Sequence, residues 1–319
     1  NALLPILAES APCEFLDAVE KAMQLKPCPF DELFLQEGKG ITGANYLTGL
    51  LWALEGLAWE EKYLVRVCVA LGELAGRDPG GQWANRPSNS LTTILLPWLP
   101  QTLASVDKRK VAVQTLLTEW PNIGWNMIIQ LLPNRRQTSS GSHKPSWRKT
   151  IPDDWKKEVT RQEYQEQIHF YAELAVDAAG QDVDRLSVLI DHFDNLHESA
   201  VNKLLKTLDS QFVLELPEQQ RLSIWESLMK FTNRHRKFSD SDWALPDQMI
   251  LRIEQVAEKL APGDLFNVYQ HLFTDCDFDL YEEKGNWEGQ QKKLETRREK
   301  AILEILQQNG IDGILEFAE

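Results

Sequence analysis

Apolar residues recur every three or four positions along almost the whole chain, which is the spacing of amphipathic helices. In the segment 60–75 the apolar side consists of Tyr63, Leu64, Val67, Leu71 and Leu74. No segment alternates apolar and polar residues as a half-buried strand would. A short strand candidate at 212–216 is explained equally well by a helix end. The pattern therefore predicts an all-α protein.

Capping residues and prolines mark the expected helix boundaries. Ser10 is followed by a proline and by Glu14, so we expect it to cap a helix that carries apolar residues to Met23. Pro121 separates two further helices. The remaining expected helices span 47–57, 60–75, 91–96, 106–120, 122–132, 153–179, 184–196, 198–209, 217–233, 246–260, 262–273, 286–308 and 311 onwards.

An internal match at an offset of 48 residues indicates a repeat. The residues Leu3, Ile6, Phe15, Leu16, Val19, Ala22 and Met23 correspond to Leu51, Leu54, Tyr63, Leu64, Val67, Ala70 and Leu71. Both copies predict a short helix, a turn and a longer helix. We therefore expect an α-solenoid of helix pairs, similar to TPR or HEAT arrays. Because only the apolar pattern matches, chance similarity and an irregular helical bundle are the alternatives.

Two polar segments interrupt the helical pattern. Residues 76–90 are rich in Gly, Pro and Asn and are expected to form a long ordered loop. Residues 134–152 are expected to form a polar linker or loop. These segments predict an N-terminal helical-repeat part over 1–133 and a C-terminal helical-repeat part over 153–319.

Composition and charge disfavour three classes: nucleic-acid-binding proteins, membrane-spanning proteins and disulfide-rich secreted proteins. The 34 basic residues against 48 acidic ones give a net charge of −14, which disfavours general binding of nucleic acid. No apolar run approaches the ~20 residues of a membrane helix. Four cysteines do not make a disulfide scaffold, and the first residues do not resemble a signal peptide. We expect a cytoplasmic piece of a longer protein.

The sequence offers no catalytic, metal or cofactor motif. It has no Gly-x4-Gly-Lys-Ser/Thr phosphate loop, no Cys-x2-Cys pair for structural zinc and no Gly-x-Ser-x-Gly elbow. We therefore expect neither an enzyme nor a cofactor in this chain.

Two local basic patches stand out against the acidic average. One lies in 135–149 and includes a tryptophan, and the other is the run 234–237. The candidate partner-binding residues are Arg135, Arg136, Trp147, Arg148, Arg234 and Arg236. Such patches bind phosphate or an acidic protein face. The alternatives are a flexible linker and cations that favour a helix C-terminus.

The chain contains 11 tryptophans. Five fall in helical apolar patterns and are expected in the core: Trp52, Trp59, Trp120, Trp125 and Trp225. Trp83 and Trp98 lie in loops where Gly and Pro turn the chain, so we expect them to be buried plugs rather than exposed binding anchors.

The segment 71–102 combines these loop features. Gly80 and Gly81 permit positive φ after Pro79, and Arg86 is placed to hold a carboxylate or loop carbonyls. Pro97 ends the following helix. The residues expected to order this segment are Pro79, Gly80, Gly81, Trp83, Asn85, Arg86, Pro97 and Trp98.

This segment, from Leu-Gly-Glu-Leu-Ala-Gly-Arg-Asp-Pro-Gly-Gly to Ile-Leu-Leu-Pro-Trp-Leu-Pro-Gln-Thr, resembles the helical-repeat region of large bacterial antiviral STAND NTPases. The resemblance covers residues 50–102 and elsewhere extends only to helical character. In that family the C-terminal repeats detect phage proteins such as terminase or portal. The family's NTPase motif and effector domain are missing here, which fits a fragment. The resemblance implies no catalytic residue.

Two functions follow as hypotheses. The first is a protein-binding sensor module whose partners are a protein ligand, such as a phage protein, and other domains of the parent chain. The second is a helical accessory domain that binds nucleic acid through the two basic patches.

Overall fold

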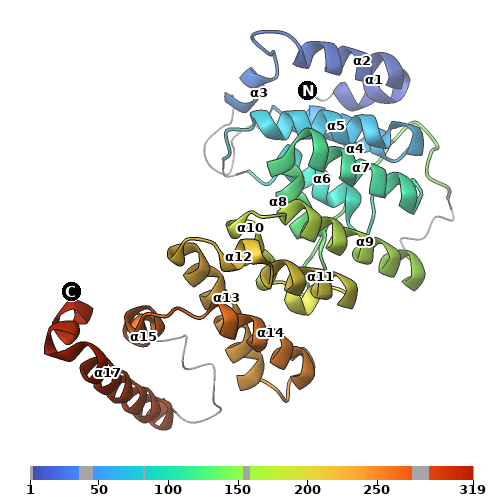
Figure 1. Cartoon of the computed structure of the whole chain (residues 1–319). Coiled ribbons are helices and arrows are strands. Elements are labelled where there is room, and N and C mark those ends of the chain that lie inside the picture. Colours follow the sequence, from blue (N-terminus) through green and yellow to red (C-terminus); the bar gives the residue numbers. More distant parts are fainter. Residues whose placement is uncertain (1–2, 36–45, 82, 154–158, 275–286, 319) are drawn as a thin grey trace. The chain divides into compact units, whose positions relative to one another are not determined.

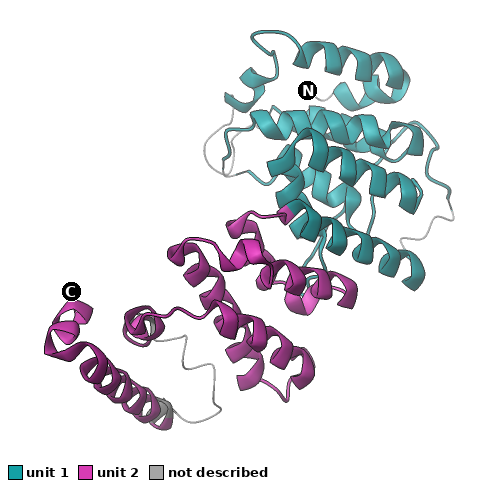
Figure 2. Ribbon diagram, viewed as in Figure 1, with its two compact units in different colours: residues 1–178 teal, residues 179–319 magenta. Residues whose placement is uncertain are grey.

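Every regular element is a helix in the computed structural model, which describes residues 3–35, 46–81, 83–153, 159–274 and 287–318 (Figure 1). The all-α prediction is confirmed. The chain divides into two compact units, Asn1–Ala178 and Ala179–Glu319 (Figure 2). The division therefore lies well beyond the polar segment 134–152, which belongs to the first unit. Among the described residues, no helix combines the length and the apolar character needed to cross a bilayer.

Prolines begin many helices of the first unit, because a proline in the first turn loses no helical hydrogen bond. The helices of this unit are α1 (Leu4–Ser10), α2 (Pro12–Met23), α3 (Asp31–Leu35), α4 (Thr48–Ala58), α5 (Glu61–Arg77), α6 (Pro87–Leu95), α7 (Val106–Glu119), α8 (Pro121–Leu131) and α9 (Arg161–Ala179). A capping box begins α9: the Thr160 hydroxyl accepts from the Glu163 amide, and the Glu163 carboxylate accepts from the Thr160 amide.

The two copies of the predicted repeat form successive helix pairs. The pair α1–α2 packs on the pair α4–α5, with α1 against α4 and α2 against α5. Matched positions such as Leu16 and Leu64 are fully buried. Leu3 and Ile6 are exposed, however, although their counterparts in α4 are buried, because α4 packs between α1, α5 and α6.

Some boundaries differ from the prediction. Ser10 is the last residue of α1, where its hydroxyl donates to the Ile6 carbonyl at 2.8 Å, and Pro12 starts α2 instead. The helix α3 was not expected. The predicted loop is shorter, because α5 continues to Arg77 and α6 already begins at Pro87.

The second unit is also built from helices that pack on near neighbours in the chain. Its elements are α10 (Val183–Ile190), the 3-10 turn η1 (Phe193–Asn195), α11 (Glu198–Leu208), α12 (Gln211–Leu214), α13 (Glu218–Lys237), α14 (Asp247–Leu260), α15 (Leu265–Thr274) and α17 (Trp287–Ala318). The strand candidate at 212–216 therefore falls largely in α12. Gly310 breaks α17 with a φ of 71°, where the sequence predicted two helices.

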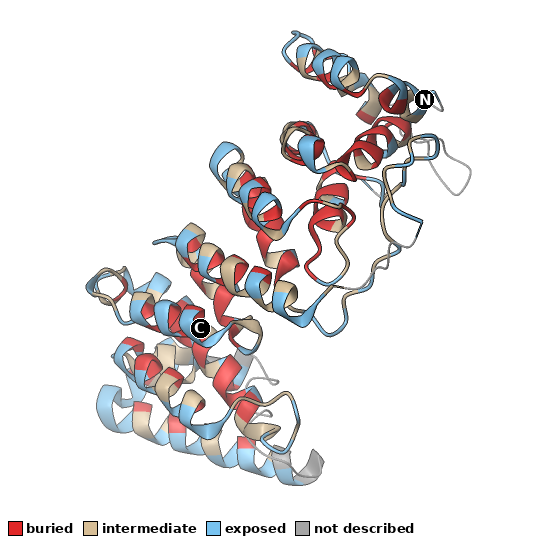
Figure 3. Cartoon of the chain, turned by 90° about the vertical axis from the view of Figure 1, so that its right-hand side faces the viewer, coloured by how far each residue is buried: buried red, intermediate tan, exposed pale blue. Residues whose placement is uncertain are grey.

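Buried residues lie on the helix faces that pack together inside each unit (Figure 3). In the first unit the core centres on α4 and α5, with Leu54, Leu64 and Leu71 fully buried. A smaller cluster of Leu272, Leu294 and Ala301 joins α15 to α17 in the second unit.

Candidate functional site

Residues 137–150, here called the strap, form the most unusual feature of the first unit. The strap contains no regular helix, yet it is held by three carboxylates, which come from α1, from α4 and from Glu60 just before α5. These carboxylates are far from it in sequence. The expected linker is thus an ordered part of the first unit.

The first anchor is Glu9, which is only 6% exposed. Its carboxylate accepts hydrogen bonds from the backbone amides of Ser146, Trp147 and Arg148 at 2.8, 2.6 and 2.9 Å. Burial alone would raise the pKa of Glu9, but the hydrogen bonds from the three backbone amides outweigh it and lower the pKa. Glu9 is therefore ionised at neutral pH.

The second anchor is Glu55 of α4. Its two oxygens accept from the Ser90 hydroxyl at 2.6 Å and from the His143 amide at 2.7 Å. The indole of Trp59 donates to the His143 carbonyl at 3.0 Å. The imidazole of His143 stacks on Trp52, with 5.2 Å between the ring centroids. This part of the strap is consequently fixed by both its backbone and its side chain.

The third anchor is Glu60. It accepts from the Arg148 guanidinium at 2.7 Å and from the Thr150 hydroxyl at 3.4 Å. Burial tends to raise the pKa of Glu60, but its bonds to Arg148 and Lys62 lower it overall. The predicted partner-binding residue Arg148 is therefore engaged within the unit.

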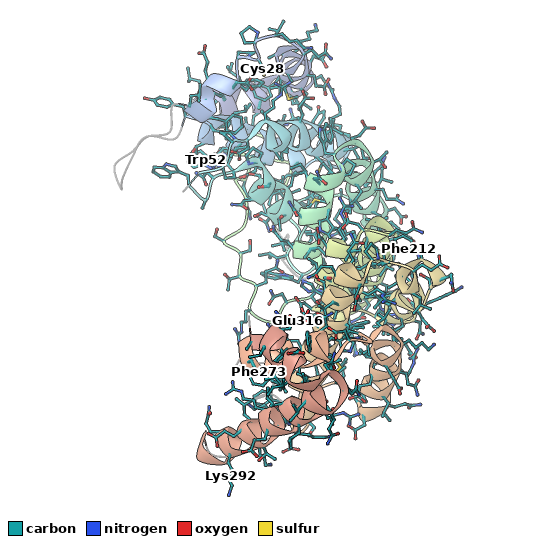
Figure 4. The ribbon with its side chains drawn as sticks, turned by 60° about the vertical axis from the view of Figure 1, so that its left-hand side comes forward. Cys28, Trp52, Phe212, Phe273, Lys292 and Glu316 are labelled. Atoms are coloured by element: carbon teal, nitrogen blue, oxygen red, sulfur yellow. The ribbon has the colours of Figure 1, made fainter. Side chains whose placement is uncertain are left out.

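Three tryptophans at the edges of the strap are exposed to solvent, and we call them the strap tryptophans. Trp147 is 75% exposed, Trp52 44% and Trp98 37%. Trp52 lies at the surface of the first unit in Figure 4. The indole of Trp98 donates to Gln137 at 2.9 Å. Each of the three thus touches the strap or belongs to it.

The burial predicted for two of these residues is wrong. Trp52 was expected in the core and Trp98 as a buried plug, but the strap supplies a polar partner at each position and leaves part of the ring in solvent. Trp83 is half-buried, as is Trp120. The core prediction is confirmed for Trp59, Trp125 and Trp225.

A polar pocket of about 560 Å³ opens beside the strap. Its lining includes Trp52 and Glu55 of α4, Asn89 of α6, and strap residues 138–141 and His143. Its walls are therefore mostly hydroxyl and amide groups around one carboxylate and one aromatic surface.

A largely buried ion pair joins the two ends of the loop between α5 and α6. Asp78 accepts from the Gly80 amide and from the Arg86 guanidinium, both at 2.9 Å. Gly80 has a φ of 80°, as expected, whereas Gly81 has no positive φ. Pro79, like Gly81, is exposed. Arg86 thus holds a carboxylate, one of the two roles predicted for it.

Asn85 lies near the end of this loop, and Pro97 follows the next helix, α6. Asn85 donates to the Thr48 hydroxyl at 3.1 Å, which ties the loop to α4. Pro97 is buried just after α6 ends. Of the residues predicted to order this segment, Gly80, Asn85 and Arg86 thus form hydrogen bonds that hold the loop, Pro97 is buried, and Trp98 reaches the surface.

The other predicted binding residues fall into two groups. Arg135 and Arg136 are exposed, and neither forms an ion pair with any described residue. Arg236 is engaged, because it pairs with Glu254 at 2.7 Å. Arg234 is exposed and lies over the ring of Trp243 at 5.0 Å. Only part of each predicted patch is therefore available to a partner.

The second unit contains an apolar pocket of about 620 Å³ between α15 and the end of α17. Phe273 and Glu316, both marked in Figure 4, contribute to its lining. Gln270 and Glu316 are the polar side chains of this lining, and the other lining residues are aromatic or aliphatic.

Searches for relatives and for metal sites add no further candidate. Comparisons with protein-family models, with curated proteins and with solved structures give no match. In the part of the chain that the structure describes, no three His, Cys, Asp or Glu side chains are grouped to hold a metal ion. The surface formed by the strap and the three strap tryptophans, here called the strap face, is thus the best-defined candidate site.

Proposed function

We propose that this chain is a protein-binding helical-repeat module and that the strap face of the first unit contacts its protein ligand. The observation that carries the proposal is that Trp52, Trp98 and Trp147 are all partly exposed and that each contacts or belongs to the ordered strap. Exposed tryptophans on a rigid surface are typical anchors of protein interfaces, because they bury a large area at little entropic cost.

The resemblance of residues 50–102 to antiviral STAND NTPases supports a more specific role. We propose that the module is the ligand-sensing part of a cytoplasmic bacterial anti-phage NTPase and that its ligand is a phage protein. The resembling segment includes most of α4, Trp98 and the loop that borders the polar pocket, so it lies next to the proposed contact surface.

The test is capture of phage proteins from lysates of infected bacteria, with the purified chain as bait and mass spectrometry of what it retains. The informative comparison is between wild type, Trp147→Ala and Leu251→Ala. Leu251 is a large apolar residue of α14 that is also exposed, so it controls for a general loss of surface hydrophobicity.

The proposal expects one phage-encoded protein to be retained by wild type and by Leu251→Ala, and to be lost or strongly reduced with Trp147→Ala. Equal retention by all three baits would contradict the proposed surface. Retention of nucleic acid that washes off with salt would favour the accessory-domain hypothesis instead.

A further inference from the structure

The polar pocket beside the strap contains a carboxylate without a cation. Glu55 accepts one hydrogen bond on each oxygen, and both donors, the Ser90 hydroxyl and the His143 amide, are neutral. No described residue forms an ion pair with Glu55. An ionised carboxylate has about four lone-pair sites, so each oxygen can accept one more bond.

The rest of the pocket complements a flat cation. The Trp52 indole is covered by His143 on one side but remains 44% exposed, so aromatic surface is available to a ligand. Asn85 and Asn89 also line the pocket, and their amide groups donate to Thr48 and to the Ala84 carbonyl. Both of these bonds use the amide nitrogen, so neither occupies the side-chain oxygen, which is an acceptor.

We propose that this pocket binds the guanidinium group of an arginine side chain presented by the protein ligand. A guanidinium is planar, stacks on aromatic rings and offers two parallel N–H groups to a carboxylate. An anionic group would be repelled by Glu55. This inference rests on the proposed function, because it names the chemistry that the strap face recognises.

The probe for this site is N-acetyl-L-arginine amide, titrated into the intact chain. Binding is followed by the ¹H–¹⁵N signal of the Trp52 indole, which is assigned as the signal that disappears in Trp52→Phe. We expect saturable shifts with a dissociation constant of about 1 mM, a reasonable order for one charged hydrogen-bonding contact plus stacking. N-acetyl-citrulline amide has the same shape without the charge and should bind at least about tenfold more weakly.

The decisive variant is Glu55→Gln. Its side-chain oxygen still accepts from the His143 amide, and its amide group donates to the Ser90 hydroxyl, so the strap stays in place while the charge is lost. We expect about a tenfold or larger loss of affinity for the arginine probe. Glu119→Gln, which removes an exposed carboxylate at the end of α7, should bind as wild type does.

Three results would each overturn the inference. They are equal binding of the arginine and citrulline probes, an unchanged affinity in Glu55→Gln, and no binding at an arginine-probe concentration 20 times the expected dissociation constant. A thermal melt of Glu55→Gln close to that of wild type shows that the variant is folded. Because the probe is a small molecule, its failure leaves the capture experiment on Trp147 unaffected, and the two proposals fail separately.

Discussion

Glu9 explains how a polar segment without a helix becomes ordered. Its carboxylate accepts three backbone amides of the strap, and hydrogen bonds to a charged acceptor contribute more than neutral ones. We predict that Glu9→Gln lowers the free energy of unfolding at pH 7 by about 1.5–3 kcal/mol. Urea denaturation measures this loss, and Glu119→Gln serves as the exposed control.

The lowered pKa of Glu9 also makes the free energy of unfolding depend on pH. The pKa of Glu9 is lowered from an ordinary value of 4.5. Its contribution is therefore complete above that value and is lost as the pH falls through the lower pKa of the folded state. The stability difference between wild type and Glu9→Gln should shrink when unfolding is measured at decreasing pH below 4.5. A difference that stays constant down to pH 3 would show that the charge of Glu9 is not responsible.

A second largely buried carboxylate is Asp78, which forms an ion pair with Arg86 across the loop between α5 and α6. Removing one member of a buried pair leaves the other charge uncompensated, which costs about 3–5 kcal/mol. We predict a loss of this order for Asp78→Ala in chemical denaturation. The exposed pair of Asp209 and Lys259, which is 2.7 Å long, is the control, and Asp209→Ala should cost about 1 kcal/mol or less. Similar losses in both variants would refute the structural role given to Asp78.

At the scale of elements, the packing of α7 against α8 depends on Gly124. A Cβ added there would lie 2.7 Å from Leu117 Cα and 2.9 Å from the Leu116 carbonyl carbon, so backbone would have to move. We predict that Gly124→Ala destabilises the chain by about 1–3 kcal/mol. Gly263 meets nothing within 4 Å, so Gly263→Ala should change stability by less than about 1 kcal/mol. Thermal melts compare the two, and equal shifts would contradict this account of the contact.

Most helices could be predicted because their signal is local. The apolar period of 3.6 residues and the prolines at 12, 87 and 121 lie within each element. Errors arose where two local signals competed, as at Ser10, which is a good cap residue but lies directly before the proline that starts α2.

The strap could not be predicted, because its partners are distant in sequence. The hydrogen-bond partners of Glu9, residues 146–148, lie 137 to 139 positions further along the chain. Glu55 bonds to His143, which is 88 positions away. For the same reason the helical spacing of Trp52 predicts a core position, whereas its stacking partner His143 lies 91 residues further on and the ring is 44% exposed. The polar pocket, which joins α4, α6 and the strap, had no sequence signal of its own.

At the scale of the whole molecule, the net charge of −14 opposes binding to a phosphate backbone. Two of the predicted basic residues, Arg148 and Arg236, are neutralised by Glu60 and Glu254. We predict that fluorescence anisotropy with a labelled DNA duplex detects no saturable binding below about 100 μM at physiological salt, the weak end of non-specific DNA binding. Micromolar binding that is lost in Arg135→Glu would favour the accessory-domain hypothesis.

Site-specific photo-crosslinking can decide whether the strap face contacts a protein ligand. The photoreactive residue p-benzoylphenylalanine replaces Trp147 in one sample and Leu251 in another, and both are irradiated in lysate from phage-infected bacteria. We expect a covalent adduct with one phage-encoded protein at position 147 and none at position 251. An adduct with that protein at position 251, with none at 147, would place the interface elsewhere on the chain.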